Sequence, residues 1–210
     1  MKPTSRLSSD PLLQGWHTRG YLPHFKVERG TYFVTYRLAD SLPRELQERF
    51  REQLRILAAT TEAERQRLIG NLRVEHAREI ERQLDRGLGR CHLCRSEIAR
   101  LVVEALRYFD EKRYHLHEWV VMPNHVHALL TPVLPHRLGE IVKAWKQYSA
   151  LRANRFLGCQ GERFWQTESF DRWVRNEAER VRIVRYIREN PVKAGLCTGE
   201  ADWPWSSAAK

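Results

Sequence analysis

The chain has 210 residues, and 36 Lys or Arg against 26 Asp or Glu give it a formal charge of +10 at pH 7. Its 42% of hydrophobic residues, including seven Trp, are enough to build a core, which excludes collagen-like and wholly disordered chains. The positive charge predicts an anionic partner, with nucleic acid first and an anionic membrane surface second.

The sequence favours a cytoplasmic protein with no membrane partner. No apolar run approaches the ~20 residues that a membrane helix needs, and residues 1–14 lack the apolar segment of a secretory signal. The four cysteines are too few and too unevenly spaced for a disulfide framework. We expect all four to be reduced thiols.

The first half of the chain predicts one strand, a helical insertion and a helix. Residues 30–38 are rich in β-branched and aromatic residues, which predicts a strand. Residues 43–95 then form the insertion, since strong helix formers with charges of alternating sign run from Pro43 to Leu88. The following helix should start near Ser96, a candidate N-cap, and reach Phe109 with one buried face.

A β-hairpin and a further helix are expected next. Residues 114–121 and 125–131 are two β-rich runs separated by a turn-like Met-Pro-Asn break, which predicts antiparallel pairing. Residues 138–157 have apolar side chains at helical spacing and end at Gly158, which is typical of a helix with a glycine cap.

The C-terminal part should contain one last helix and a tail. Residues 164–174 are aromatic and irregular, with a short strand among the expected structures. A helix over 177–190 should stop at Pro191, because proline lacks the amide proton and clashes with the preceding turn. Residues 192–210 should lie extended on the body, so that residues 1–210 form a single domain.

His125 and His127 are candidate metal ligands. Two residues apart in a predicted strand, both imidazoles leave the same face of the sheet and can converge on one divalent ion. The same spacing also fits histidines that are polar surface or hydrogen-bonded core residues. The pair therefore needs support from residues elsewhere in the chain.

Two further groups of metal-binding residue types have weaker patterns. His115 and His117 form a second pair on the preceding strand, and the two pairs could form a four-histidine site. Without a known register we interpret His115 and His117 as structural or, at most, as hydrogen-bond partners of the metal ligands. Cys91 and Cys94 have the spacing of half a zinc site, yet no second Cys/His pair follows nearby. We interpret this cysteine pair as incidental.

The last predicted helix presents a tyrosine with an asparagine one turn later. Ile183 and Ile187 mark its apolar face, which leaves Tyr186 and Asn190 on the opposite shoulder and pointing in one direction. A hydroxyl nucleophile and a carbonyl ligand can thus face one site. A lone tyrosine of this kind also fits the rim of a core.

Bases alternate with aromatic residues in the second half of the chain, a mixture that can hold phosphates and stack unpaired bases. The bases that we interpret as DNA-binding are Lys146, Arg152, Arg155, Arg172, Arg175 and Arg182.

Five segments together resemble one known family, the REP-associated tyrosine transposases, relatives of the single-tyrosine, two-histidine (HUH) transposases of small insertion sequences. The segments are WVVMPNHVH (119–127), FWQ (164–166), FDRWV (170–174), YIRENPVKAGL (186–196) and WPWSS (203–207). The resemblance spans residues 21 to 207. The first twenty residues match nothing in the family.

This resemblance implies an α+β fold, with a ferredoxin-like (RRM-like) antiparallel sheet, helices packed on it, and a helical insertion. Position by position, it implies that Tyr186 is the nucleophile and that His125, His127 and Asn190 bind Mg²⁺ or Mn²⁺, with Glu189 in reserve as the third ligand. Arg188 departs from the acidic or amide residue expected there.

The resemblance also implies the reaction and the partner. Family members cleave and rejoin single-stranded DNA at REP-type hairpins through a 5′-phosphotyrosine, which stores the bond energy and needs no external energy source. For this chain we expect REP-like single-stranded hairpins as partners, a monomer or homodimer, and a bacterial, nucleoid-associated location.

Two alternatives from other classes stay open on the sequence. One is a non-catalytic single-stranded nucleic-acid-binding protein in which the histidines are incidental. The other is a small metallohydrolase that uses both histidine pairs. Tyr186 discriminates, because only the transposase needs it as a nucleophile that becomes linked to DNA.

Overall fold

The computed structural model describes residues 15–18, 23–26 and 30–209. Its elements in chain order are β1 (Gly15–Thr18), β2 (Pro23–Lys26), β3 (Tyr32–Arg37), α1 (Arg44–Ala58), α2 (Glu62–Leu84), a 3₁₀ turn (His92–Cys94), α3 (Ser96–Arg107), β4 (Tyr114–Val121), β5 (His125–Pro132), α4 (Leu138–Leu157), β6 (Phe170–Trp173), α5 (Glu177–Lys193) and a second 3₁₀ turn (Glu200–Asp202).

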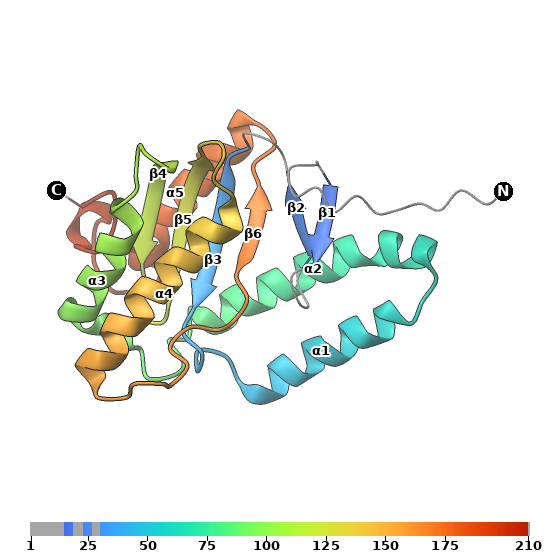
Figure 1. The fold of residues 1–210 in the computed structure, drawn as a ribbon, viewed down its shortest axis with the longest axis horizontal. Coiled ribbons are helices and arrows are strands. Elements are labelled where there is room, and N and C mark those ends of the chain that lie inside the picture. Colours follow the sequence, from blue (N-terminus) through green and yellow to red (C-terminus); the bar gives the residue numbers. More distant parts are fainter. Residues whose placement is uncertain (1–14, 19–22, 27–29, 210) are drawn as a thin grey trace.

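A four-stranded antiparallel sheet in the order β4-β5-β3-β6 forms the centre of the molecule (Figure 1). The predicted hairpin forms between β4 and β5, and β3 pairs with β5 so that Thr35 lies opposite His127. The α+β fold expected from the sequence is confirmed. The separate β1–β2 hairpin was not predicted, and residues 1–14 lie outside the described part of the chain.

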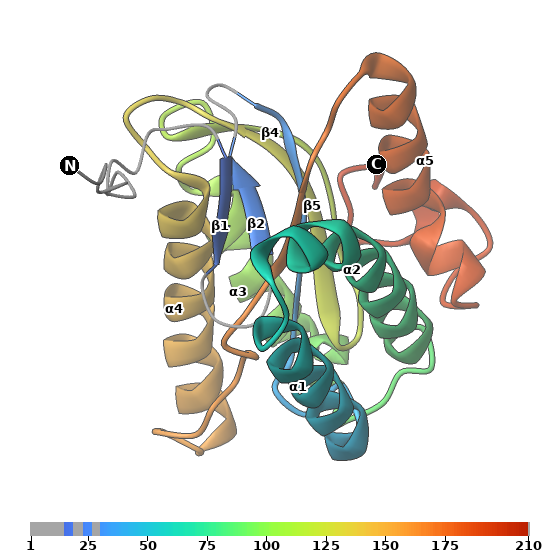
Figure 2. The ribbon, with the colours of Figure 1, turned by 90° about the vertical axis from the view of Figure 1, so that its right-hand side faces the viewer.

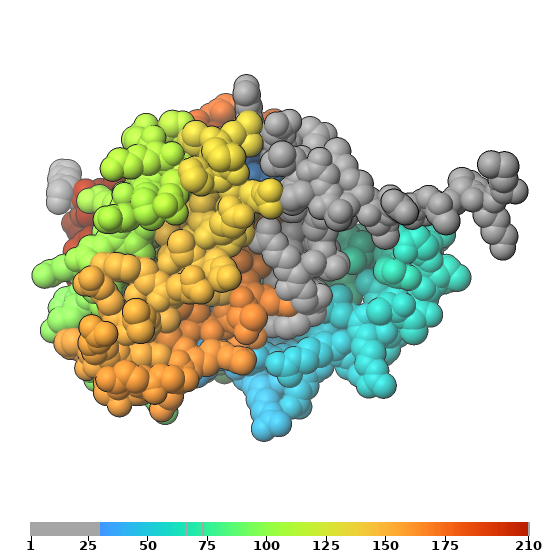
Figure 3. Space-filling view, in the orientation of Figure 1, coloured from blue at the N-terminus to red at the C-terminus, as the bar shows by residue number. Residues whose placement is uncertain are grey.

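The two faces of the sheet are covered by different helices. Val126, Ala128 and Leu130 of β5 point to one face, where they join the larger apolar core under α3 and α4. These two helices cover the face turned to the viewer in Figure 3. The intervening residues His125, His127 and Leu129 point to the other face, over which α5 packs (Figure 2).

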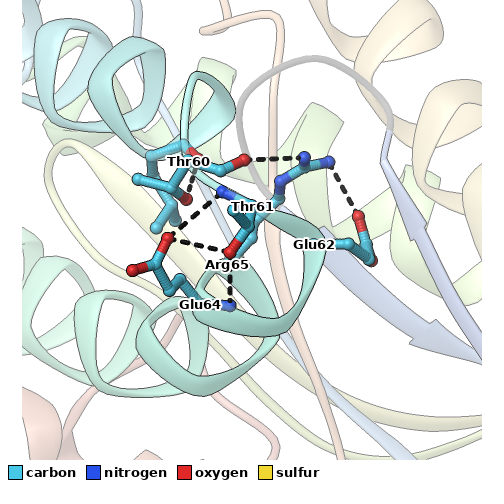
Figure 4. A network of polar contacts seen from close by, with 6 residues as sticks. Thr60, Thr61, Glu62, Glu64 and Arg65 are labelled. Carbon is cyan, nitrogen blue, oxygen red and sulfur yellow. Dashed lines mark hydrogen bonds and ion pairs between the residues drawn. The ribbon is translucent and has the colours of Figure 1, made fainter.

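The predicted insertion consists of two helices, α1 and α2, which are broken by Thr60 and Thr61. Thr61 caps α2 because its side chain accepts the Glu64 amide while the Glu64 carboxylate accepts the Thr61 amide (Figure 4). This reciprocal arrangement satisfies two amides that the first turn of a helix leaves without partners. The cap explains why the helix-forming run does not continue as one long helix.

The insertion covers the β3–β6 side of the histidine face. Phe50 of α1 and His76 and Ile80 of α2 line a cavity of about 30 Å³ together with Thr35 and Phe170 of the sheet. Two parts of the chain therefore cover the histidine face (Figure 2). The α5 helix packs against β4 and β5, and the insertion lies next to Thr35 of β3 and Phe170 of β6.

The end of α5 corrects one prediction. The helix does not stop before Pro191 but continues to Lys193. Proline costs a helix one amide donor and a clash with the carbonyl four residues earlier, and here both fall in the last turn, where the chain is about to leave the helix. The carbonyls of Asn190 and Pro191 still accept the amides of Ala194 and Leu196.

The C-terminal tail is only partly extended. It contains the 3₁₀ turn at 200–202 and then runs beside β4, where Val121 donates its amide to Trp205 and Ser207 donates its amide to Trp119. These bonds cover the outer edge of β4, which would otherwise present unpaired backbone groups. Within the described part of the chain, no helix has the length and apolar character that a membrane span needs.

Candidate active site around two histidines and a tyrosine

The two candidate metal ligands converge as the two-residue spacing predicts. The Nε2 atoms of His125 and His127 lie 3.1 Å apart, and both side chains are almost completely buried. Each Nδ1 atom has its own partner, which is the side-chain amide oxygen of Asn124 for His125 at 2.7 Å and the Thr35 hydroxyl for His127 at 2.8 Å. The polar contacts thus hold both rings with their Nε2 atoms facing one point.

Tyr186 reaches the same point from α5. Its hydroxyl lies 3.4 Å from His127 Nε2, and the two rings lie edge to face with centroids 5.2 Å apart. Phe33 of β3 stacks on His127 and meets Tyr186 edge-on, so it packs against both rings. The sequence pattern predicts Tyr186 and Asn190 on the shoulder opposite the apolar face of this helix, but that prediction is wrong. Tyr186 packs beside Ile183 and Ile187 against the sheet, and Asn190 is buried with them.

Asn190 carries an acceptor without a partner. The residue is 4% exposed, and among the described residues its Oδ1 atom is one of the few buried side-chain oxygens with no hydrogen bond. Leaving such an atom unpaired costs about 1–3 kcal/mol. It lies one helical turn after Tyr186, and its NH₂ group, as a hydrogen-bond donor to the tyrosine oxygen, lowers the tyrosine pKa.

Burial keeps the groups of this site uncharged. It lowers the pKa of His125 to about 3, and burial and the neighbouring His125 hold the pKa of His127 well below its ordinary value. Burial also raises the pKa of Tyr186, and the nearby carboxylates of Glu81 and Asp85 raise it further. At neutral pH the site thus contains two neutral imidazoles, a protonated phenol and an amide oxygen.

These residues fit a divalent cation. Neutral imidazole nitrogens bind Zn²⁺ at about 2.0–2.1 Å, so one divalent ion of this kind can contact two nitrogens that lie 3.1 Å apart. The unpaired Asn190 oxygen is a third donor, and the negative charges of Glu81 and Asp85 favour a cation nearby. Within residues 30–209 no three His, Cys, Asp or Glu side chains cluster in a metal-binding arrangement.

The structure keeps the other candidate residues away from this point. His117 donates to or accepts from Thr131 at the far end of β5, and His115 pairs with Glu111. The register contains a bulge between Leu116 and Glu118, which sequence spacing could not reveal. A site built from both histidine pairs is therefore not formed.

Tyr148 and the cysteine pair are also separate from the histidines. Tyr148 lies on α4, across the sheet, where its hydroxyl bonds to Glu104. Cys91 precedes the 3₁₀ turn before α3 and Cys94 is its last residue, and the Cys91 thiol donates to the Gly87 carbonyl.

The residues interpreted as DNA-binding lie on both sides of the sheet. Lys146, Arg152 and Arg155 belong to α4, and Lys146 is half-buried with its ammonium bonded to the carbonyls of Gln166 and Thr167. Burial lowers the pKa of Lys146 to about 8. These three residues therefore belong to the helix layer opposite the histidines.

The other three bases lie closer to the tyrosine. Arg172 and Arg175 form ion pairs with the buried Glu179 near the start of α5, and Arg182 is exposed one turn before Tyr186. The sequence pattern did not separate these two groups, because alternating bases and aromatics do not indicate on which face a residue lies.

Two neighbours of Asn190 have partners away from the histidine pair. Glu189 pairs with Arg185 and Lys193 on its own helix. Arg188, which departs from the family pattern, pairs at 2.9 Å with the buried Glu118 of β4. Its charge is thus compensated by a residue that the family motifs did not include.

Sequence reasoning missed four residues around the site. Thr35 and Asn124 bond to the two histidines, and Glu81 and Asp85 extend their charges to Tyr186 from α2. Asn124 was available as a signal, since it directly precedes His125 in the motif. The other three come from β3 and the insertion, and only the fold brings them to the site.

Comparisons with known proteins agree with this arrangement. The family model described as "Transposase IS200 like" matches residues 90–190, which include both histidines, Tyr186 and Asn190. The REP-associated tyrosine transposase of Escherichia coli (strain K12) is 28% identical over 97 residues, which are 46% of this chain and 56% of that relative. The match thus spans little more than half the length of the relative.

A solved structure shares the fold. It is described as a REP-associated tyrosine transposase bound to a REP hairpin. The match covers 88% of this chain and 79% of the solved chain, with a TM-score of 0.51 and 18% identity. The resemblance that the motifs indicated is confirmed, because residues 90–190 match the IS200-like transposase model and a REP-associated tyrosine transposase is among the similar proteins.

Proposed function

We propose that this protein is a metal-dependent single-stranded DNA transposase that cleaves and rejoins strands through Tyr186. The observation that carries the proposal is the 3.4 Å approach of the Tyr186 hydroxyl to His127 Nε2, beside a second histidine and an unpaired amide oxygen. A binding protein has no need for a buried phenol held at a pair of uncharged imidazoles.

The reaction exchanges one phosphodiester for another. The Tyr186 oxygen forms a bond to phosphorus, the bond from phosphorus to the 3′ oxygen breaks, and the phenolic proton is lost while the leaving oxygen becomes a 3′-hydroxyl. The DNA 5′ end stays on the protein as a phosphotyrosine. Attack by another 3′-hydroxyl reverses these changes and rejoins the strands.

His125, His127 and Asn190 would hold Mg²⁺ or Mn²⁺, and imidazole ligands tilt the preference towards Mn²⁺. When bound, the ion offsets the negative charge that develops on the phosphoryl oxygens. Such compensation is needed here, because Glu81 and Asp85 repel a phosphate that approaches Tyr186. The protein itself supports the site from behind, since Phe33 packs against the rings of His127 and Tyr186.

We further propose REP-like single-stranded hairpins as the substrate, bound by a monomer or homodimer. Support comes from the net charge of +10 and from the solved relative, whose description names a REP hairpin. Arg172, Arg175 and Arg182 would contact phosphates near the cleaved bond, because they lie on the side of the sheet that carries Tyr186. Lys146, Arg152 and Arg155 would contact DNA only if it also crosses the α4 side.

The proposal is tested by incubating the full chain with fluorescent hairpin DNA and Mn²⁺ and examining a denaturing gel. A labelled band at the mass of protein plus DNA supports it, provided that EDTA abolishes the band. Cleavage without a covalent band would favour a metallohydrolase. Hairpin binding with neither cleavage nor a band would favour a non-catalytic binding protein.

A further inference from the structure

The turn between β4 and β5 contains a buried asparagine that links the histidine site to the insertion. Asn124 is 1% exposed. Its Nδ2 atom donates to the carbonyls of Leu84 at 3.3 Å and Leu88 at 3.0 Å, and its Oδ1 atom lies 2.7 Å from His125 Nδ1. Leu84 is the last residue of α2 and Leu88 follows it, so the Asn124 side chain connects the insertion to His125.

These contacts determine where the proton of His125 lies. Backbone carbonyls only accept hydrogen bonds, so the Asn124 NH₂ group must face Leu84 and Leu88, and its oxygen must face His125. An amide oxygen also only accepts, so His125 carries its proton on Nδ1. A neutral imidazole has a single N–H, which leaves His125 Nε2 with a free lone pair.

The same reasoning gives His127 the opposite proton position in the metal-free protein. His125 Nε2 is an acceptor, so its 3.1 Å contact with His127 Nε2 requires His127 to donate from that atom. His127 Nδ1 is then an acceptor, and the Thr35 hydroxyl at 2.8 Å donates to it. The Thr35 hydroxyl can also rotate and accept a hydrogen bond from His127 Nδ1. The Asn124 oxygen can only accept, so it has no such choice.

We propose that Asn124 and Thr35 are positioning residues that prepare the histidine pair for a divalent ion. Asn124 holds His125 in the Nδ1–H form, with Nε2 free before any ion arrives. Thr35 lets His127 change, because its hydroxyl turns from donor to acceptor as the ring loses its proton at Nε2 and gains one at Nδ1. The ring charge is unchanged. This inference rests on the proposed metal role of the two histidines.

Imidazole nitrogen NMR of the ¹⁵N-labelled full chain tests the two proton positions directly. Without metal, His125 should show the Nδ1–H form and His127 the Nε2–H form. With Zn²⁺ as a diamagnetic probe, His125 should keep its form, and His127 should convert to Nδ1–H. A metal-free His125 in the Nε2–H form, or an unchanged His127 after Zn²⁺ binding, would overturn the proposal.

Substitutions separate this role from simple anchoring of α2. Asn124→Leu removes both functions, and we expect Mn²⁺ affinity to fall by about 10–100-fold, as is usual for partners of metal ligands. Asn124→Asp keeps the acceptor for His125 but loses both donors to the insertion, so its Mn²⁺ affinity should stay within a few-fold of wild type. If the aspartate variant loses as much affinity as the leucine variant, anchoring alone explains the residue.

Thr35 and a buried asparagine elsewhere supply matched variants. Thr35→Val should weaken Mn²⁺ binding because His127 Nδ1–H is left without an acceptor, and Thr35→Ser should restore it. Asn154 is also buried, and its Nδ2 bonds to the Glu162 carbonyl on the α4 side. Asn154→Leu should lower stability without changing Mn²⁺ affinity. Equal loss of Mn²⁺ affinity in Asn154→Leu and Asn124→Leu would contradict a local role.

The two proposals fail in different ways. Wild-type protein that binds neither Zn²⁺ nor Mn²⁺ would contradict the metal role in the proposed function. Wild-type protein that binds metal and forms the DNA adduct, but has His125 in the Nε2–H form, would contradict only the role of Asn124.

Discussion

The two histidines have separate partners, yet their Nε2 atoms face the same point, so each should be essential to the chemistry and dispensable for much of the DNA binding. His125→Ala and His127→Ala should each abolish the covalent adduct, while hairpin affinity in a mobility-shift assay stays within a few-fold of wild type. The reason is that phosphate contacts elsewhere supply the binding energy.

His115→Ala is the matched control, since His115 pairs with Glu111 away from the site. It should form the adduct as wild type does. Loss of the adduct in His115→Ala would mean that the second histidine pair takes part in the reaction after all.

His76 should make the free energy of unfolding depend on pH. It is 2% exposed, stacks on Phe50 and bonds to Gln53, and burial lowers its pKa below the ordinary value of 6.5. Below pH 6.5 the unfolded chain takes up a proton that the folded chain does not, so the free energy of unfolding falls as pH falls. His76→Phe keeps the stacked ring and removes this proton uptake.

Urea unfolding at pH 7.5 and pH 5.5 measures the effect. Between the two values, wild type should lose more stability than His76→Phe. Equal losses would show that His76 titrates normally in the folded protein.

At the scale of elements, a buried carboxylate fastens α5 and the C-terminal tail to β4. Glu118 accepts from Arg188 of α5 and from Ser207 of the tail. Arg188→Met leaves this carboxylate buried with one partner fewer, which should lower the free energy of unfolding by about 1–3 kcal/mol in urea. The double variant with Glu118→Gln should lose less than the sum of the single changes, and strict additivity would contradict a direct interaction.

Elements were predicted correctly where residues within or next to them determine their structure. The strand at 30–38 and the hairpin at 114–131 were predicted because β-rich composition and the Pro-Asn turn are local signals. The α5 helix continues past Pro191 because the amide and the space that proline costs a helix are lost only in the last turn. Composition alone does not indicate how close to the helix end a proline lies. The break at Thr61 could also be predicted from the sequence, since the Thr-x-x-Glu pattern of a capping box marks the start of a new helix.

At the scale of the whole molecule, the candidate DNA-binding bases are divided between two faces, and this predicts unequal effects. Arg182→Gln, on the tyrosine side, should weaken hairpin binding several-fold and reduce the slope of log affinity against log salt by about 1. Arg152→Gln removes the same charge from α4, where its guanidinium lies over Tyr148, and should have the smaller effect. A larger effect of Arg152→Gln would move the main DNA path to the α4 side.

The site could be predicted only as far as its residues lie in recognisable motifs. His125, His127, Tyr186 and Asn190 all fall within such motifs, and α5 brings Tyr186 to His127 across 59 positions. Thr35, Glu81 and Asp85 come from β3 and the insertion, where no motif marks them. Their approach depends on strand register and helix packing, which a single sequence does not specify.

Peptide mapping of the trapped adduct shows directly whether Tyr186 is the residue that becomes linked to DNA. Tyr186→Phe keeps the ring packing on Phe33 but removes the attacking oxygen, so folding and hairpin binding should persist with no adduct. Tyr148→Phe, on the opposite side of the sheet, should leave the adduct intact. We expect one phosphotyrosyl peptide, containing Tyr186. A phosphotyrosyl peptide containing Tyr148 would contradict the role of Tyr186 as the nucleophile.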